Sequence, residues 1–209
     1  MKYIKFFIVL MSINCSYCQI LFNSSADIAL FSGDLTHFEI EDSQLNLNAP
    51  SSGISQLTYS FDSTNRLSLS LNFSLNFSPS NSNKFALFIG NDSLFENGYI
   101  IEVGETGSND AIVLSSIKNG IKSNITRGTE ARFAQAFDAH LSIFINDSIN
   151  VISSNLTDTL QEVTVLNDSS IFYQYVVLQC KYTSTRIDKF SFDNFYLEPQ
   201  EAIYPTPPT

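Results

Sequence analysis

The stretch from Arg66 to Ser78, RLSLSLNFSLNFS, alternates strictly between apolar and polar residues. Leu or Phe stands at every odd position from 67 to 77, and Ser or Asn at every even one. Only the two-residue repeat of a β-strand places all these apolar side chains on one face, because a helix would spread them around its axis. A long strand with one apolar and one polar face is typical of an antiparallel sheet in a two-layer sandwich.

The rest of the chain repeats this pattern in shorter form. More than ten short alternating segments are separated by turn residues, and the clearest hairpin signal is the Asn119-Gly120 pair between 111–117 and 121–125. Only residues 129–136 permit a helical turn. We therefore predict an all-β fold, an antiparallel two-sheet sandwich or jelly roll.

Length and composition are consistent with one such domain. The chain has 209 residues, of which 44% are hydrophobic, so a single core of ordinary size is expected. Only 15% of the residues are charged, and Ser, Asn and Thr supply the polar surface instead.

The N-terminus has the features of a secretory signal peptide. Lys2 and Lys5 precede an apolar run from 6 to 11, and Ser16-Tyr17-Cys18 offers small residues for cleavage before Gln19. The apolar run is shorter than a membrane span requires. The alternative interpretations are a buried first strand and a lipoprotein signal with acylation of Cys15 or Cys18. The lipoprotein signal is disfavoured, because Asn14 and Tyr17 precede these cysteines where a small residue is wanted. We expect a secreted protein, outside the cell or at its surface, with no membrane span.

Cleavage after Cys18 would remove two lysines and no acidic residue, so the net charge would fall from −10 to −12. A surface this acidic is repelled by nucleic acid and by anionic membranes. Cleavage also removes Cys15 and Cys18 and leaves Cys180 alone, so no disulfide framework is expected.

The chain ends in the Pro/Thr-rich segment YPTPPT, which is typical of a stiff linker. The predicted organisation is a signal peptide at 1–18, a β-sandwich at 19–197 and a linker or tail at 198–209. A linker at the end suggests that further domains follow.

Several segments between about 30 and 197 resemble a known family. They are LNLNA (45–49), NGY (97–99), EVGETGSNDAI (102–112), RG (127–128), CKYTS (180–184) and KFSFD (189–193). These segments resemble the N-terminal β-sandwich module of secreted multidomain Bacteroidetes proteins, which often carry lamin-tail domains. The resemblance implies a concanavalin/laminin-G-like fold and supplies no catalytic residues. The chain lacks the early tryptophan that this family leads us to expect.

Two places offer oxygen ligands for calcium. Glu102, Glu105 and Asp110 accompany the glycine-rich loop 104–110, where glycine lets backbone carbonyls turn inward. A solvated loop explains the same residues, and the spacing is not that of an EF-hand. Asp193 is a second place, because in such sandwiches a carboxylate on the last strand often helps to hold a structural calcium where the first and last strands meet. An ordinary surface aspartate is the alternative.

No catalytic constellation is evident. The acidic run at 39–42 lacks the spacing of paired glycosidase carboxylates. His37 and His140 are the only histidines, and neither has a nearby serine or aspartate motif or a metal-ligand spacing. We expect His140 to lie on the polar face of its strand, and we do not expect an enzyme.

Glycan binding is the sharper functional hypothesis. Sugar sites stack their ligands on exposed aromatic rings, and Tyr99, Tyr173, Tyr175 and Tyr196 are the rings available. Tyr173 and Tyr175 are expected on one face of the strand at 171–182. The alternative places these tyrosines at the margin of the core with their hydroxyls in water. The polar row of the long strand (Ser68, Ser70, Asn72, Ser74 and Asn76) resembles a sugar-binding row, but in a chain without Trp it favours an ordinary solvated face.

These patterns predict a secreted, non-catalytic β-sandwich that serves recognition or adhesion outside the cell. The alternatives are a carbohydrate-binding module supported by calcium, a structural spacer and, least favoured, a glycoside-active enzyme. A glycan or a cell-surface protein is the expected partner, and structural calcium is the one cofactor that the residues suggest.

Overall fold

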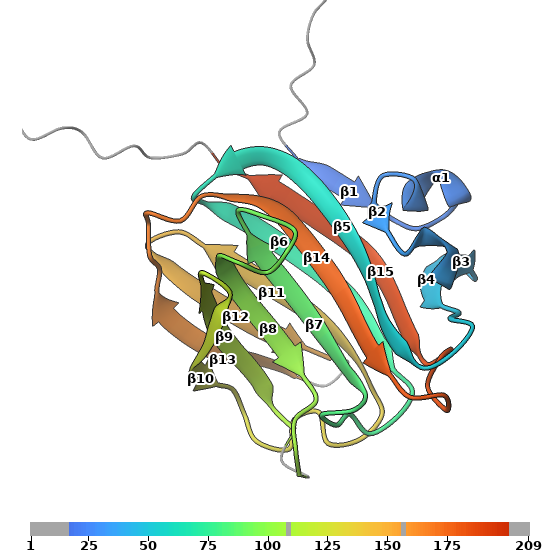
Figure 1. Cartoon of the computed structure of the whole chain (residues 1–209). Helices are drawn as coiled ribbons and strands as arrows, with labels where there is room; N and C mark the ends of the chain where they lie inside the picture. Colours follow the sequence, from blue (N-terminus) through green and yellow to red (C-terminus); the bar gives the residue numbers. More distant parts are fainter. Residues whose placement is uncertain (1–16, 108–109, 156–157, 201–209) are drawn as a thin grey trace, which may run out of the picture.

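The computed structural model describes residues 17–107, 110–155 and 158–200 and contains two antiparallel sheets packed face to face (Figure 1). The signal-peptide prediction and the Pro/Thr-rich segment therefore fall almost entirely outside the described residues. The predicted two-sheet antiparallel sandwich is confirmed.

The first sheet, sheet A, has eight strands, and the second, sheet B, has seven within the described residues. In pairing order, sheet A consists of β13 (Thr159–Leu166), β12 (Ser148–Ser154), β11 (Phe137–Ile145), β6 (Leu67–Leu75), β15 (Phe190–Pro199), β4 (Gln44–Leu47) and β3 (Phe38–Glu41), with β1 (Cys18–Ile20) also paired to β15. Sheet B consists of β10 (Ile121–Arg127), β9 (Ile112–Lys118), β8 (Gly98–Val103), β7 (Lys84–Gly90), β14 (Tyr173–Tyr182), β5 (Gly53–Thr64) and β2 (Ser32–Gly33).

The alternating segment forms β6, in the middle of sheet A. Leu67, Leu71 and Leu75 are at most 1% exposed, and the polar residues between them are partly exposed on the outer face. Burying each such leucine stabilises the fold by about 1.5–3 kcal/mol. The period-two pattern therefore aligns one whole face of β6 with the core between the sheets.

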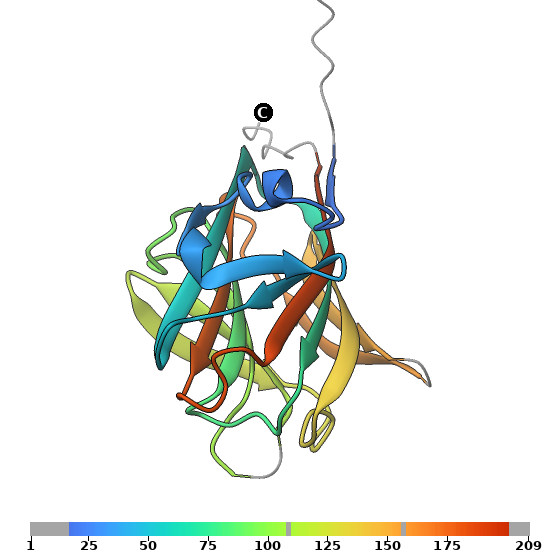
Figure 2. The same ribbon diagram turned by 90° about the vertical axis from the view of Figure 1, so that its right-hand side faces the viewer.

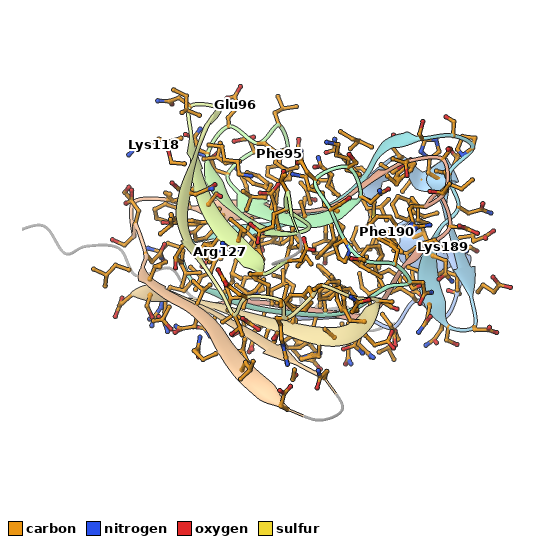
Figure 3. All side chains as sticks on the ribbon, turned by 90° about the horizontal axis from the view of Figure 1, so that it is seen from below. Phe95, Glu96, Lys118, Arg127, Lys189 and Phe190 are labelled. Carbon is orange, nitrogen blue, oxygen red and sulfur yellow. The ribbon has the colours of Figure 1, made fainter. Side chains whose placement is uncertain are left out.

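The core itself is rich in phenylalanine. Phe73 of β6 packs against Phe85 of sheet B, with ring centroids 5.0 Å apart, and Phe85 packs against Phe192 of β15 at 5.4 Å. Figure 3 shows the two layers with Phe190 lying between them. A second, smaller apolar cluster lies on the outer face of sheet B, where Phe95 covers Phe88 at 4.6 Å.

Helical structure is scarce and lies elsewhere than expected. Residues 129–136 form turns rather than a helix, and Ala131 there has a φ of 60°, which a right-handed helix cannot use. The described residues hold one short α-helix, α1 (Ser25–Ile28), and one 3-10 turn (Leu35–His37). The Asp27 carboxylate accepts a hydrogen bond from the Ser24 backbone N–H at 2.9 Å and closes the start of α1.

The connections agree with the turn signals. Asn119 and Gly120 have φ values of 52° and 73°, as the tight turn between β9 and β10 requires, so the predicted hairpin is confirmed. Figure 2 shows the β3–β4 hairpin crossing the side of the sandwich that faces the viewer. The first and last described strands meet, since Cys18 of β1 pairs with Leu197 of β15.

Candidate functional site

A cavity of about 340 Å³ opens on the outer face of sheet A. Its walls come from β4, β6, β11, β15 and the end of β12. Nine of the twelve lining residues are polar, although apolar atoms supply most of the lining surface, and the residues are Gln44, Asn72, Phe73, Ser74, Asp138, Ala139, His140, Ser154, Asn155, Ser191, Phe192 and Asp193. This volume lies in the range of small-molecule sites. The sequence favoured a plain solvated face here, and the structure instead places the cavity on it.

The register of three strands explains why these side chains meet. Each outward residue of β6 has one partner on β11 and one on β15. From the cavity end, the rows are Asp138/Ser74/Ser191, His140/Asn72/Asp193, Ser142/Ser70/Tyr196 and Phe144/Ser68/Glu198. The cavity occupies the first two rows. Segments more than fifty residues apart in sequence thus form one surface.

A β-bulge in β15 places both Asp193 and Tyr196 on this surface. Asp193 and Tyr196 are three residues apart, so a regular strand would point them to opposite sides. The register shifts between them, and Asn194 takes a φ of 50°. The extra residue returns Tyr196 to the outer face while Phe195 remains 0% exposed in the core.

His140 is held in one orientation by its neighbours. Its Nδ1 lies 2.7 Å from Asn72 Oδ1, which can only accept, so Nδ1 carries the proton. The Ser142 hydroxyl donates to Nε2 at 3.1 Å. Partial burial lowers the pKa of His140 because the charged ring would lose water. The imidazole is therefore neutral at neutral pH.

The two aspartates of the cavity differ in their partners. The Asp193 carboxylate accepts hydrogen bonds from the Asn194 backbone N–H at 2.6 Å and from Asn194 Nδ2 at 2.9 Å. The Asp138 side chain is exposed, and its carboxylate makes no hydrogen bond or ion pair with any described residue. Asp138 thus presents an open acceptor, and Asp193 a positioned one.

Tyr99 and Tyr173 are core residues and offer no ring face to a ligand. They are 4% and 0% exposed, with ring centroids 6.3 Å apart. The Asp168 backbone N–H donates to Tyr99 Oη at 3.1 Å, and Tyr173 Oη donates to Asn167 Oδ1 at 2.8 Å. Burial raises the pKa of both hydroxyls. The core-margin alternative describes these two tyrosines correctly, except that their hydroxyls bond to protein.

Tyr173 and Tyr175 do not share a face, contrary to the expectation. The pairing of β14 with β5 shifts between them, so Tyr173 turns into the core and Tyr175 stays partly exposed on the outer side of sheet B. Tyr196 is also partly exposed, but on sheet A. Of the four tyrosines, Tyr196 is the one on the surface that holds the cavity.

Glu102 is engaged by two lysines on the outer side of sheet B. Lys84 Nζ lies 2.7 Å from one carboxylate oxygen, and Lys122 contacts the other. Burial opposes ionisation of Glu102, but hydrogen bonds from Lys122 and Lys84 outweigh it and hold the carboxyl pKa below its ordinary value. These partners occupy the oxygens that a calcium ion would need.

Glu105 and Asp110 lie together, and one oxygen of each carboxylate is also in use. Glu105 pairs with Arg127 and accepts from the Ala111 N–H, and Asp110 Oδ1 accepts from the Glu105 N–H at 2.9 Å. Asp110 Oδ2 is buried without a hydrogen-bond partner, which makes it a candidate oxygen ligand for a cation. Across the described ranges, no three His, Cys, Asp or Glu side chains are grouped to hold a metal.

His37 has a serine neighbour in space that the sequence did not indicate. Its Nδ1 lies 2.7 Å from Ser55 Oγ, which in turn contacts the Tyr182 hydroxyl at 2.5 Å. Ser55 is 0% exposed, so a substrate has no path to its oxygen. These hydrogen-bonded hydroxyl and imidazole groups connect residues 34–37 to sheet B. They do not make Ser55 an accessible nucleophile.

No protein-family model and no curated protein matches the sequence. Within the described residues, no helix is long and apolar enough to cross a membrane. Solved structures do match. The VIP36 exoplasmic/lumenal domain, bound to Ca²⁺ and Man3GlcNAc, aligns with a TM-score of 0.66 at 11% identity over 90% of each chain.

Two further structures share the arrangement. A legume lectin-like domain from Entamoeba histolytica aligns with a TM-score of 0.55 at 13% identity, over 86% of this chain and 94% of that one. The carbohydrate-binding module CBM66 from Bacillus subtilis aligns at 0.51 and 12% identity, over 86% and 91%. At these identities the likeness concerns the fold, and this chain has the fold of the legume-lectin-like, concanavalin-like β-sandwiches.

Proposed function

We propose that this chain is a non-catalytic carbohydrate-binding β-sandwich and that the cavity on the outer face of sheet A is its binding site. The observation that carries the proposal is the cavity of about 340 Å³, lined by carboxylate, amide, hydroxyl and imidazole groups from adjacent strands. The likeness to lectins and to a carbohydrate-binding module supports the choice of ligand class.

The lining suits the hydroxyls of a sugar, each of which donates one hydrogen bond and accepts others. Asp138 and Asp193 accept from them, Asn72 does both, and the serine hydroxyls adapt to either role. Asp193 and His140 stand on strands and make hydrogen bonds to other side chains. These hydrogen bonds hold them in place before a ligand binds. Polar groups placed in this way give a shallow site its specificity.

The two carboxylates are poorly placed for glycoside hydrolysis. Asp138 and Asp193 stand on β11 and β15, which flank β6, and lie one row apart. Two inter-strand spacings across and two residues along put their backbones about 12 Å apart. Retaining glycosidases hold their carboxyl groups about 5 Å apart, and inverting ones up to about 9.5 Å. We expect a mixture of oligosaccharides incubated with the protein to remain uncleaved.

The setting that we propose is outside the cell, in recognition or adhesion, with a glycan or a glycosylated surface protein as the partner. The signal-like N-terminus, the acidic charge and the resemblance to secreted Bacteroidetes modules with lamin-tail domains support it. Calcium support belongs to the same proposal, with Asp110 as the ligand residue that the contacts favour. A spacer domain would not need the cavity.

A glycan array tests the proposal directly. We expect the folded protein to bind a set of related glycans, and Asn72→Ala with Asp193→Asn to abolish that binding. Gln179→Ala, which changes a partly exposed residue on sheet B, is the matched control and should bind as the wild type does. An array without binding to the wild-type protein would contradict the proposal.

A further inference from the structure

We infer that the site continues along β6 beyond the cavity to a second, aromatic subsite formed by Phe144 and Tyr196, and that its ligand is a neutral oligosaccharide chain rather than a single sugar. This inference rests on the proposed function and specifies its ligand class. It follows from the four rows of side chains on β11, β6 and β15.

Phe144 is the first element of the aromatic subsite. It stands on the polar face of β11 with 42% of its surface exposed, two rows away from His140. Its partners across the sheet are Ser68 on one side and Asn150 on the other, both too small to cover a phenyl ring. The ring therefore presents apolar surface on a face that is otherwise polar.

Tyr196 is the second element. The bulge at Asn194 points it outward in the row next to that of Phe144, on the opposite side of β6. Its hydroxyl donates to Glu198 at 3.0 Å, which holds the ring in place, and the residue remains partly exposed. The neighbouring described ring, Tyr17, lies 6.1 Å away and belongs to the segment that signal cleavage would remove.

The residues between the two aromatic rings leave room for a chain. Along β6 the outward positions are Ser74, Asn72, Ser70 and Ser68, so a row of short side chains runs between the taller ones of β11 and β15. The first and last rows are six residues apart, or about 20 Å at the usual strand rise. A single sugar ring is much shorter than this.

The charge of the surface selects the kind of chain. The outward residues of the four rows include Asp138, Asp193 and Glu198, and none of them is lysine or arginine. His140 is neutral because partial burial lowers its pKa. Sialylated, uronic or sulfated glycans would meet uncompensated negative charge, whereas neutral sugars meet acceptors for their hydroxyls and apolar rings for their faces.

The test compares neutral gluco-, manno- and galacto-oligosaccharides of increasing length with sialylated and sulfated glycans. We expect affinity to rise with chain length and the anionic glycans to bind more weakly than their neutral parents. Phe144→Ser and Tyr196→Ser should each weaken binding of the longest neutral chains about tenfold and leave the shortest ligands unchanged. Asn72→Ala should weaken every length, because it changes the cavity.

Leu94→Ser is the control. Leu94 is 76% exposed in the loop between β7 and β8, on the other sheet, so its variant should bind all lengths as the wild type does. Thermal unfolding verifies that each variant is folded. Wild-type binding that is independent of length, or unchanged in both aromatic variants, would overturn the aromatic subsite and leave the cavity proposal intact. Preference for anionic glycans would overturn the neutral ligand class. No glycan binding at all would overturn both proposals.

Discussion

His140 of β11 faces Asn72 of β6 across the centre of sheet A, with its Nδ1 2.7 Å from the Asn72 Oδ1. The contact joins residues 68 positions apart in the sequence. It also sets the proton of the ring on Nδ1 and leaves Nε2 to accept from Ser142. A neutral, oriented imidazole is therefore part of the cavity wall.

Acid should weaken the fold through His140. Partial burial lowers its pKa from the ordinary 6.5, so the unfolded chain takes up the proton at a higher pH than the folded one. The free energy of unfolding should fall as the pH drops through about 6.5 and reach its full loss below the folded pKa. His140→Gln should lack this loss in urea titrations at about pH 8 and about pH 5. Equal pH dependence in both proteins would contradict the assignment.

Glu102 should contribute to stability above acidic pH. Its carboxylate is bound by Lys84 and Lys122 at 10% side-chain exposure, so Glu102→Gln should lower the free energy of unfolding by about 1–3 kcal/mol. Because its folded pKa is depressed, the contribution of the wild type is present above about 4.5 and lost as the pH falls through the folded value. Glu130→Gln, at 63% exposure, should change stability by less than about 0.5 kcal/mol. Similar losses in both variants would be inconsistent with this account.

Two phenylalanines should differ sharply on truncation. Phe73 is 2% exposed and its ring packs against Phe85, Phe133 and Phe137, so Phe73→Ala should cost about 3–5 kcal/mol. Phe144→Ala removes an exposed ring and should cost about 0.5 kcal/mol or less. Chemical denaturation measures both. A large loss from Phe144→Ala would mean that its ring serves packing.

Calcium should act through Asp110. Its Oδ2 is buried without a hydrogen-bond partner, so added calcium should raise the melting temperature of the wild type, and EDTA should reverse the rise. Asp110→Asn should remove the calcium response, while Asp193→Asn on the far sheet should keep it. A melting temperature that is unaffected by calcium in the wild type would refute this part of the proposal.

The fold could be predicted from the sequence because burial in a sandwich has a period of two. Every odd residue from Leu67 to Leu75 is buried, as the alternation indicates. His140 on the outer face of β11 follows from the same rule. The structure of residues 129–136 was harder to predict from the sequence. Phe133 packs into the core from a set of turns, and turns have no periodic pattern of burial.

The site could be predicted only in fragments. Asn72 and Asp193 were recognised separately, one as a polar strand position and the other as a possible metal ligand, but only strand pairing shows that they are neighbours. Irregularities in strand pairing determine which way the tyrosines point. The register shift near Tyr175 turns Tyr173 into the core, and the bulge at Asn194 turns Tyr196 to the outer face. One inserted residue reverses the face of a strand, and no alternation pattern reveals where the insertion lies.

The location of the ligand is the central claim, and a two-dimensional NMR titration tests it most directly. The probe is the neutral oligosaccharide that binds best on the array, added to the ¹⁵N-labelled protein. We predict that the largest amide shifts occur at Ser74, Asp138, His140 and Asp193, around the cavity of sheet A. Shifts confined to sheet B, around Lys84 and Gln179, or no shifts at a saturating concentration, would contradict the account.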